Sequence, residues 1–158
     1  IKIEKKNLNL KILIFLKIAP DINDKEIEKI SEILLNNDIE AIIISNTSDE
    51  TREKLKDIQK YQKGGLSGKP LEDKTNLLIS KFYNNFENKI KIIGVGGVDT
   101  GLSAYNKFLS GADLIQLYTG MVYKGPNIVN LIKNDLSKLL LKDGVKNFRE
   151  IIGKKTKT

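Results

Sequence analysis

The sequence lacks cysteine and histidine altogether, although it runs to 158 residues. Without cysteine this segment has no disulfide, thiolate nucleophile or cysteine-ligated zinc, and without histidine it has no imidazole base. Long apolar runs are also missing: the longest, Ile12 to Leu16, falls far short of the ~20 residues of a membrane-spanning helix. Chemistry in this segment must rest on lysines, carboxylates, hydroxyls, amides and backbone groups, or on a bound cofactor.

Positive charge is abundant, with 27 Lys and Arg residues against 20 Asp and Glu and a net charge of +7. A basic excess of this kind can mark a nucleic-acid-binding surface. Here, however, lysines are mixed with acids, as in residues 24–29, which is typical of a solvated helix face. We therefore predict no nucleic-acid partner, and we interpret residues 153–158 as a frayed basic tail.

Strand-like and helix-like segments alternate through the chain, which favours an α/β fold with a parallel sheet. The predicted strands cover residues 12–18, 40–45, 90–95 and 113–118. The predicted helices cover residues 24–37, 71–86, 101–110 and 126–141, with a short one near 145–152. We predict a lead-in loop over residues 1–11 and a single domain over residues 12–152.

The length of the chain leaves two interpretations of this pattern open. A (β/α)₈ TIM barrel needs about 200–250 residues, so four strand–helix units would make only half of one. An open, doubly wound domain fits 158 residues well. Because the first residue is Ile1 rather than Met, we expect a C-terminal excerpt, or a product that another segment completes.

Polar groups stand at the ends of the first two predicted strands. Residues 12–18 are nearly continuous apolar sequence, which predicts a strand buried on both faces. Lys17 near its end is costly to bury without an anionic partner, so it is either a cation aimed at a bound cofactor or a lysine that reaches out to solvent. Ser45, Asn46 and Thr47 follow the second strand and suit either recognition of a polar ring or an ordinary turn.

Glycine-rich segments occupy the long loop and the ends of the last two strands. Residues 46–70 form a polar stretch too long for an ordinary connection, with a charged part, 49–60, that can be helical. Residues 64–68 and 94–97 are rich in glycine, which lets the backbone approach a ligand closely. Backbone N–H groups after the third and fourth strands are placed to bind a phosphate, as they do in (β/α)₈ barrels.

In their order and spacing, these segments resemble the dihydroorotate dehydrogenase family. The matching segments are Lys17-Ile18-Ala19-Pro20-Asp21, Ser45-Asn46-Thr47, Gly64-Gly65-Leu66-Ser67-Gly68-Lys69-Pro70-Leu71, Ile93-Gly94-Val95-Gly96-Gly97-Val98 and Gln116-Leu117-Tyr118-Thr119-Gly120. The Ala-Pro-Asp and Gly-Gly-Leu-Ser-Gly-Lys-Pro motifs are similar to those of the quinone-dependent class 2 enzymes. The resemblance implies the C-terminal half of an FMN-binding (β/α)₈ barrel that oxidises dihydroorotate to orotate in pyrimidine synthesis.

The resemblance also implies roles for eight residues. The expected FMN-binding residues are Lys17, Ser45, Gly68, Gly97, Tyr118 and Thr119, and the expected substrate-binding residues are Asn46 and Thr47. Ser45 and Thr119 replace the family's usual Thr and Ser, and both changes keep a hydroxyl group. The catalytic base belongs to the other half of the barrel, so we assign no catalytic residue or metal here, and we reject Ser67 as a substitute base.

The implied partners are dihydroorotate, orotate, a quinone and the N-terminal half of the barrel. The implied location is a peripheral contact with the cytoplasmic face of a bacterial inner membrane, or with the mitochondrial inner membrane in a eukaryote. Two alternatives stay open at this point. One is a catalytically silent half-barrel or assembly fragment, and the other is an FMN barrel oxidoreductase that uses fumarate or NAD.

Overall fold

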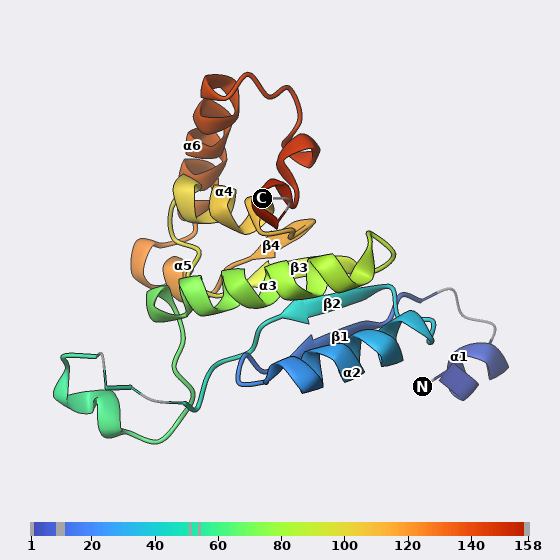
Figure 1. Cartoon of the computed structure of the whole chain (residues 1–158). Coiled ribbons are helices and arrows are strands. Elements are labelled where there is room, and N and C mark those ends of the chain that lie inside the picture. The colour runs from blue at the N-terminus through green and yellow to red at the C-terminus, as the bar shows by residue number, and fades with distance from the viewer. Residues whose placement is uncertain (1, 9–11, 51, 54, 157–158) are drawn as a thin grey trace.

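The computed structural model describes residues 2–8, 12–50, 52–53 and 55–156. Four parallel strands form one sheet in chain order (Figure 1). The strands are β1 (Phe15–Ile18), β2 (Ala41–Ile44), β3 (Lys91–Val95) and β4 (Leu114–Gln116). The α-helices are α1 (Lys2–Asn7), α2 (Asp24–Leu35), α3 (Glu72–Phe86), α4 (Gly101–Leu109), α5 (Thr119–Lys124) and α6 (Ile128–Lys142). Four short 3₁₀ helices in the described residues are η1 (Ile58–Tyr61), η2 (Lys69–Leu71), η3 (Phe148–Ile151) and η4 (Lys154–Thr156). The four strand–helix units are those of half a (β/α)₈ barrel, as predicted.

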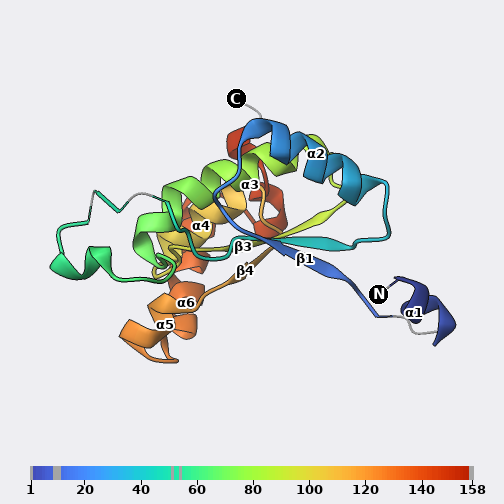
Figure 2. The ribbon, with the colours of Figure 1, turned by 90° about the horizontal axis from the view of Figure 1, so that it is seen from below.

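The main core lies between the sheet and the helices α2 and α3, which cover the same face of it (Figures 1 and 2). Ile42, Ile44 and Ile92 point from the strands into this layer and are almost fully buried. Phe82 and Phe86 meet them from α3, with their ring centroids 5.4 Å apart. Aromatic and branched side chains of this size supply most of the apolar burial, so this layer fixes where the strand ends lie.

Helix boundaries follow local sequence signals. Asn23 caps α2: its side chain accepts from the N–H of Glu26, and the Glu26 carboxylate accepts from the N–H of Asn23. Thr100 and Ser103 form the equivalent reciprocal pair at the start of α4. These capping boxes lie just beyond the ends of β1 and β3, so they set the length of the two loops that follow these strands, and the second loop carries Gly97.

The first predicted strand is shorter and less buried than expected. β1 begins at Phe15, and Phe15 and Leu16 keep 46% and 40% of their surface exposed. β1 is the edge of the sheet, and only Ile18 of its four residues joins the main core. Lys17 is therefore exposed rather than buried, and the argument from the cost of burying its charge does not hold.

Three segments differ from their predicted secondary structure near the chain ends. The predicted lead-in loop contains α1, whose Lys- and Glu-rich sequence favours helix, while residues 1 and 9–11 lie outside the described part. The short helix predicted near 145–152 is the 3₁₀ turn η3, capped by Asn147 and Glu150. The predicted frayed tail contains η4, and residues 157–158 lie outside the described part.

Two further differences lie close to the site. In the charged segment 49–60 only η1 is helical, and residues 51 and 54 lie outside the description. The Arg52 guanidinium donates to the carbonyl of Gln62 instead, which favours an open loop over a helix. The helix α5 is not predicted, because it is only six residues long and contains Gly120, a poor helix former.

Within the described part of the chain, no helix combines the length and the apolar character needed to cross a membrane.

Candidate functional site

The carboxyl ends of all four strands open into one cavity of about 750 Å³. All eight residues for which the sequence predicts a site role line it: Lys17, Ser45, Asn46, Thr47, Gly68, Gly97, Tyr118 and Thr119. The parallel register explains this convergence. Ile18 pairs with Ile44, and Ile44 pairs with Gly94, so the segments that follow these strands all leave the sheet at its carboxyl-terminal end. Lys17 and Thr119, which are 102 positions apart in the sequence, thus line the same cavity.

The segment after β2 presents two exposed polar side chains over a buried one. Ser45 is almost fully buried, and its hydroxyl donates to the carbonyl of Asn46 at 2.9 Å. The N–H of Asn46 donates to the carbonyl of Ile18 at 2.8 Å, which ties this segment to the end of β1. Asn46 and Thr47 are exposed in the cavity, so their amide and hydroxyl groups are free to meet a ligand.

Asp21 holds the same segment from the side. Its carboxylate accepts from the Ser48 hydroxyl at 2.7 Å, from the N–H of Asp49 at 2.8 Å and from Lys74 Nζ at 2.5 Å. Burial tends to raise the pKa of Asp21, but these three donors outweigh it and leave that pKa below its usual value. The charged carboxylate therefore fixes the backbone that carries Asn46 and Thr47.

The glycine-rich loop between η1 and η2 packs closely on two predicted site residues. A Cβ on Gly65 would lie 2.0 Å from Thr47 Oγ1, and a Cβ on Gly68 would lie 2.9 Å from Thr119 Cγ2. The Thr119 hydroxyl lies 3.0 Å from the Ser67 hydroxyl, within hydrogen-bonding distance. Only glycine allows these approaches, so the loop is held against the ends of both β2 and β4.

The loop after β3 also lines the cavity. Gly97 has a φ of +76° and lies so close to the start of α3 that a Cβ would come within 2.5 Å of Glu72 Cβ. A Cβ on Gly120 would lie 2.6 Å from the carbonyl oxygen of Val98, which joins this loop to α5. The backbones of the two strand ends therefore run close together, as the prediction of a shared phosphate-binding site requires.

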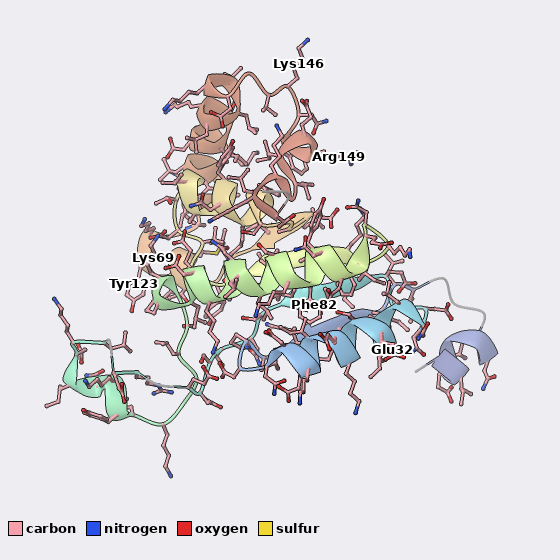
Figure 3. The ribbon with its side chains drawn as sticks, viewed as in Figure 1. Glu32, Lys69, Phe82, Tyr123, Lys146 and Arg149 are labelled. Atoms are coloured by element: carbon pink, nitrogen blue, oxygen red, sulfur yellow. The ribbon has the colours of Figure 1, made fainter. Side chains whose placement is uncertain are left out.

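Lysines and acidic residues both lie at the cavity wall. Lys17, Lys69 and Lys124 all line it, and Figure 3 marks Lys69 beside Tyr123 at this end of the molecule. Glu72, 2.5 Å from Lys69 Nζ, raises the pKa of Lys69, and Asp99 at 3.5 Å adds to the effect. Because Glu72 and Asp99 balance the charges of Lys69 and Lys124, an anionic ligand group at the β3–β4 side of the cavity would depend on backbone N–H groups.

Sequence reasoning missed several residues of the cavity wall. Lys69 lies in the glycine-rich segment that resembles the family, but no role was predicted for it. Asp99 and Lys124 were also missed, although Lys124 Nζ donates to the backbone carbonyl of Asp99 at 2.9 Å. The one available signal is that Asp99 lies two residues after the glycine-rich segment 94–97; nothing in the sequence links it to Lys124.

Comparison with known proteins agrees with this geometry. The profile of the family described as dihydroorotate dehydrogenase matches residues 2–140. Among curated proteins, the chain is 40% identical to a dihydroorotate dehydrogenase (quinone) of Bartonella tribocorum over 149 residues, which are 94% of the chain and 41% of that protein. It is 39% identical to the protein of the same name from Agrobacterium fabrum, over 95% of the chain and 41% of the relative. The chain thus spans about two fifths of the length of these relatives.

Solved structures of the same family share the fold. The crystal structure of DHODH from Eimeria tenella in complex with ferulenol matches with a TM-score of 0.88 and 34% identity, over 92% of this chain and 39% of that one. The ligand-free form matches with a TM-score of 0.87 and 35% identity. Family profile, curated relatives and fold agree, and the chain belongs to the dihydroorotate dehydrogenase family.

Proposed function

We propose that this chain supplies the cofactor- and substrate-binding end of a quinone-dependent dihydroorotate dehydrogenase. The observation that carries the proposal is the convergence of all eight expected site residues on one cavity at the strand ends. The relatives that share 38–40% of its residues over nine tenths of the chain bear the name dihydroorotate dehydrogenase (quinone). Family membership and cavity geometry therefore point to the same activity.

FMN fits the residues present. A cavity of about 750 Å³ is within the usual range of cofactor sites, and Gly68 and Gly97 let the backbone of its wall pack against Thr119 and Glu72, where a Cβ would clash. The backbone N–H groups of Tyr118 and Thr119, with Gly97 opposite, would hold the phosphate, while Ser45 and Gly68 would contact the flavin. Lys17 would place a positive charge beside the ring. When bound, FMN supplies the hydride-accepting chemistry of the reaction.

The substrate would be held by Asn46 and Thr47. The Asn46 amide offers a donor and an acceptor, which match the amide edges of a dihydroorotate ring. Asp21 keeps this segment in place, so the chain orients the substrate before any proton or hydride moves. We assign no general base to this chain: the proton would go to a group on the remaining strand–helix units, which would also close the barrel.

The quinone and the membrane belong to the same proposal. A quinone is the electron acceptor named for the curated relatives, and we propose a peripheral contact with the membrane that contains it. The proposed partners are thus dihydroorotate, orotate, a quinone and the other half of the barrel.

The visible spectrum of the purified chain with FMN tests this proposal. We expect a bound flavin after gel filtration, with a Kd in the micromolar range or below, alone or with the complementary half-barrel of a relative added. A reconstituted barrel should then reduce a quinone analogue when given dihydroorotate. A barrel that holds no flavin, or that holds flavin but is not reduced by dihydroorotate, would overturn the proposal.

A further inference from the structure

Lys107 is a fully buried lysine outside the cavity, and the proposed function gives it no role. It lies on α4 with 0% of its surface exposed, and it is absent from the cavity wall. Its Nζ donates to Thr75 Oγ1 at 2.8 Å and to Asn76 Oδ1 at 2.9 Å, both on α3. Burying an ammonium group costs free energy unless it is paired or hydrogen-bonded, so a buried lysine at this position is expected to have a structural or functional role.

Gly94 in β3 and Gly96 and Gly97 just after it each rest on a different side chain. A Cβ on Gly94 would lie 2.9 Å from Lys107 Cδ, and one on Gly96 would lie 3.0 Å from Thr75 Cγ2. Gly97 packs on Glu72 in the same way. The aliphatic stem of Lys107 therefore lies under the end of β3, and its head group holds the residue that lies under the loop.

Thr75 connects this support to the loop itself. It is fully buried, and its hydroxyl lies 2.9 Å from the carbonyl of Leu71, 3.1 Å from that of Glu72 and 3.4 Å from that of Gly96. Because Lys107 donates to the same oxygen, it fixes the rotamer of Thr75 and leaves the Thr75 proton for these carbonyls. These hydrogen bonds link Lys107 on α4 and Thr75 on α3 to the backbone of Gly96, which lines the cavity.

We propose that Lys107 is a positioning residue that holds the end of β3 and the loop that follows it, Gly94–Gly97, in their ligand-binding shape through Thr75. The inference rests on the proposed function, because the loop is the expected cradle of an FMN phosphate. Its ligand class is the phosphate end of a flavin nucleotide. The side chain of Lys107 does not touch the ligand, so it acts only through the geometry of the loop.

The burial of Lys107 is consistent with this position. Burial lowers the pKa of Lys107 to about 8, against the opposing effect of the Glu72 carboxylate. Glu72 is the acidic group that faces this lysine across the start of α3. A neutral amine and an ammonium can both donate to Thr75, so the support persists through neutral pH.

The first test uses the flavin-free 158-residue chain and backbone ¹⁵N relaxation. In the wild type, Gly96 and Gly97 should have order parameters near 0.85, about the value of rigid backbone. In Lys107→Met they should fall below about 0.6, while residues of β1 and β2 keep their values. Lys133→Met, the same change at an exposed lysine on α6, is the matched control and should leave the loop unchanged.

Thr75 provides the second pair of variants, in case Lys107→Met fails to fold. Thr75→Val should loosen the loop as Lys107→Met does, and Thr75→Ser, which keeps the hydroxyl, should restore it. In titrations with FMN, both loosening variants should raise Kd about tenfold, with no added loss in the double variant. Unchanged order parameters at Gly96 and Gly97, or an equal loss across the whole chain, would overturn the inference.

The two proposals fail in different ways. A wild type that binds no FMN even when its barrel is complete contradicts the proposed function, whereas the flavin-free order parameters still decide the role of Lys107. Normal FMN binding together with an undisturbed loop in Lys107→Met contradicts only the role of Lys107.

Discussion

The Asp21 carboxylate accepts a hydrogen bond from the Ser48 hydroxyl at 2.7 Å, although 27 positions separate the two residues. The bond links the loop after β1 to the loop after β2 and is supported by Lys74 from α3. One charged group therefore sets the relative position of two strand ends.

Replacing Asp21 with Asn should lower the free energy of unfolding at pH 7 by about 1–3 kcal/mol, because charge-assisted bonds to a partly buried carboxylate are lost. The pKa of Asp21 is lowered in the folded chain, so its contribution is present above the ordinary value and disappears as the pH falls through the folded pKa. Urea unfolding from pH 7 to pH 3 should show the two proteins converging. Asp24→Asn, at an exposed ion pair with Lys81, is the control and should change little.

Replacing Lys17 with Ala should weaken FMN binding about tenfold, because a charge beside the flavin ring would be lost from an open cavity. Fluorescence titration with FMN measures this, and stopped-flow flavin reduction in a complete barrel adds the kinetic effect. Lys133→Ala is the matched control. Normal flavin content together with a normal rate of flavin reduction would contradict the role of Lys17.

Replacing Asn46 with Ala should reduce kcat/KM for dihydroorotate by roughly 10–100-fold in a complete barrel, since a ring hydrogen bond would be lost. Flavin binding should not change, because Asn46 is expected to contact the substrate alone. Steady-state kinetics and an orotate titration test the two parts separately. Kinetics equal to those of the exposed control Asn130→Ala would count against the assignment.

Replacing Gly97 with Ala should destabilise the chain by at least about 2 kcal/mol and abolish tight flavin binding. Its φ of +76° disfavours a side chain, and a Cβ would overlap Glu72. Gly125→Ala is a strict control, because Gly125 has a φ of +72° with no atom within 4 Å of the added Cβ. It should cost only the backbone strain, about 1 kcal/mol, and leave FMN binding intact. Equal losses in both variants would mean that the contact with Glu72 is unimportant.

Stability should rise with pH because of Lys107. Its pKa falls from 10.5 to about 8 on folding, so the unfolded chain binds more protons between these values and raising the pH favours the folded state. The free energy of unfolding should increase by about 2 kcal/mol from pH 7 to pH 9.5. Lys107→Met should flatten this rise.

The pH range of that measurement avoids a second group. Tyr105 donates to the Asp143 carboxylate, and this bond, together with burial, raises the pKa of Tyr105 to about 12. Its stabilising effect is complete below the ordinary value of 10.0 and is lost only as the pH rises towards 12. A wild type with constant stability between pH 7 and 9.5 would contradict the assignment to Lys107.

Much of the fold was predictable because parallel strands and capped helices leave local signals. The apolar run that becomes β2, the capping residues Asn23 and Thr100, and the spacing of polar strand ends all follow from neighbouring residues. The burial of β1 was not predictable in this way. Phe15 looks like a core residue in sequence, but its exposure depends on which face of the sheet other segments cover.

By itself, the sequence determined the family, the four strand–helix units and eight of the residues that line the cavity. Each of these depends on residue type and spacing along the chain. The tertiary structure alone decided that Lys17 is exposed, that Asp21 anchors Ser48 and that Lys107 reaches Thr75 beneath the glycines after β3. The reason is physical: burial, partner choice and the pKa values that follow from them are set by contacts between segments distant in sequence.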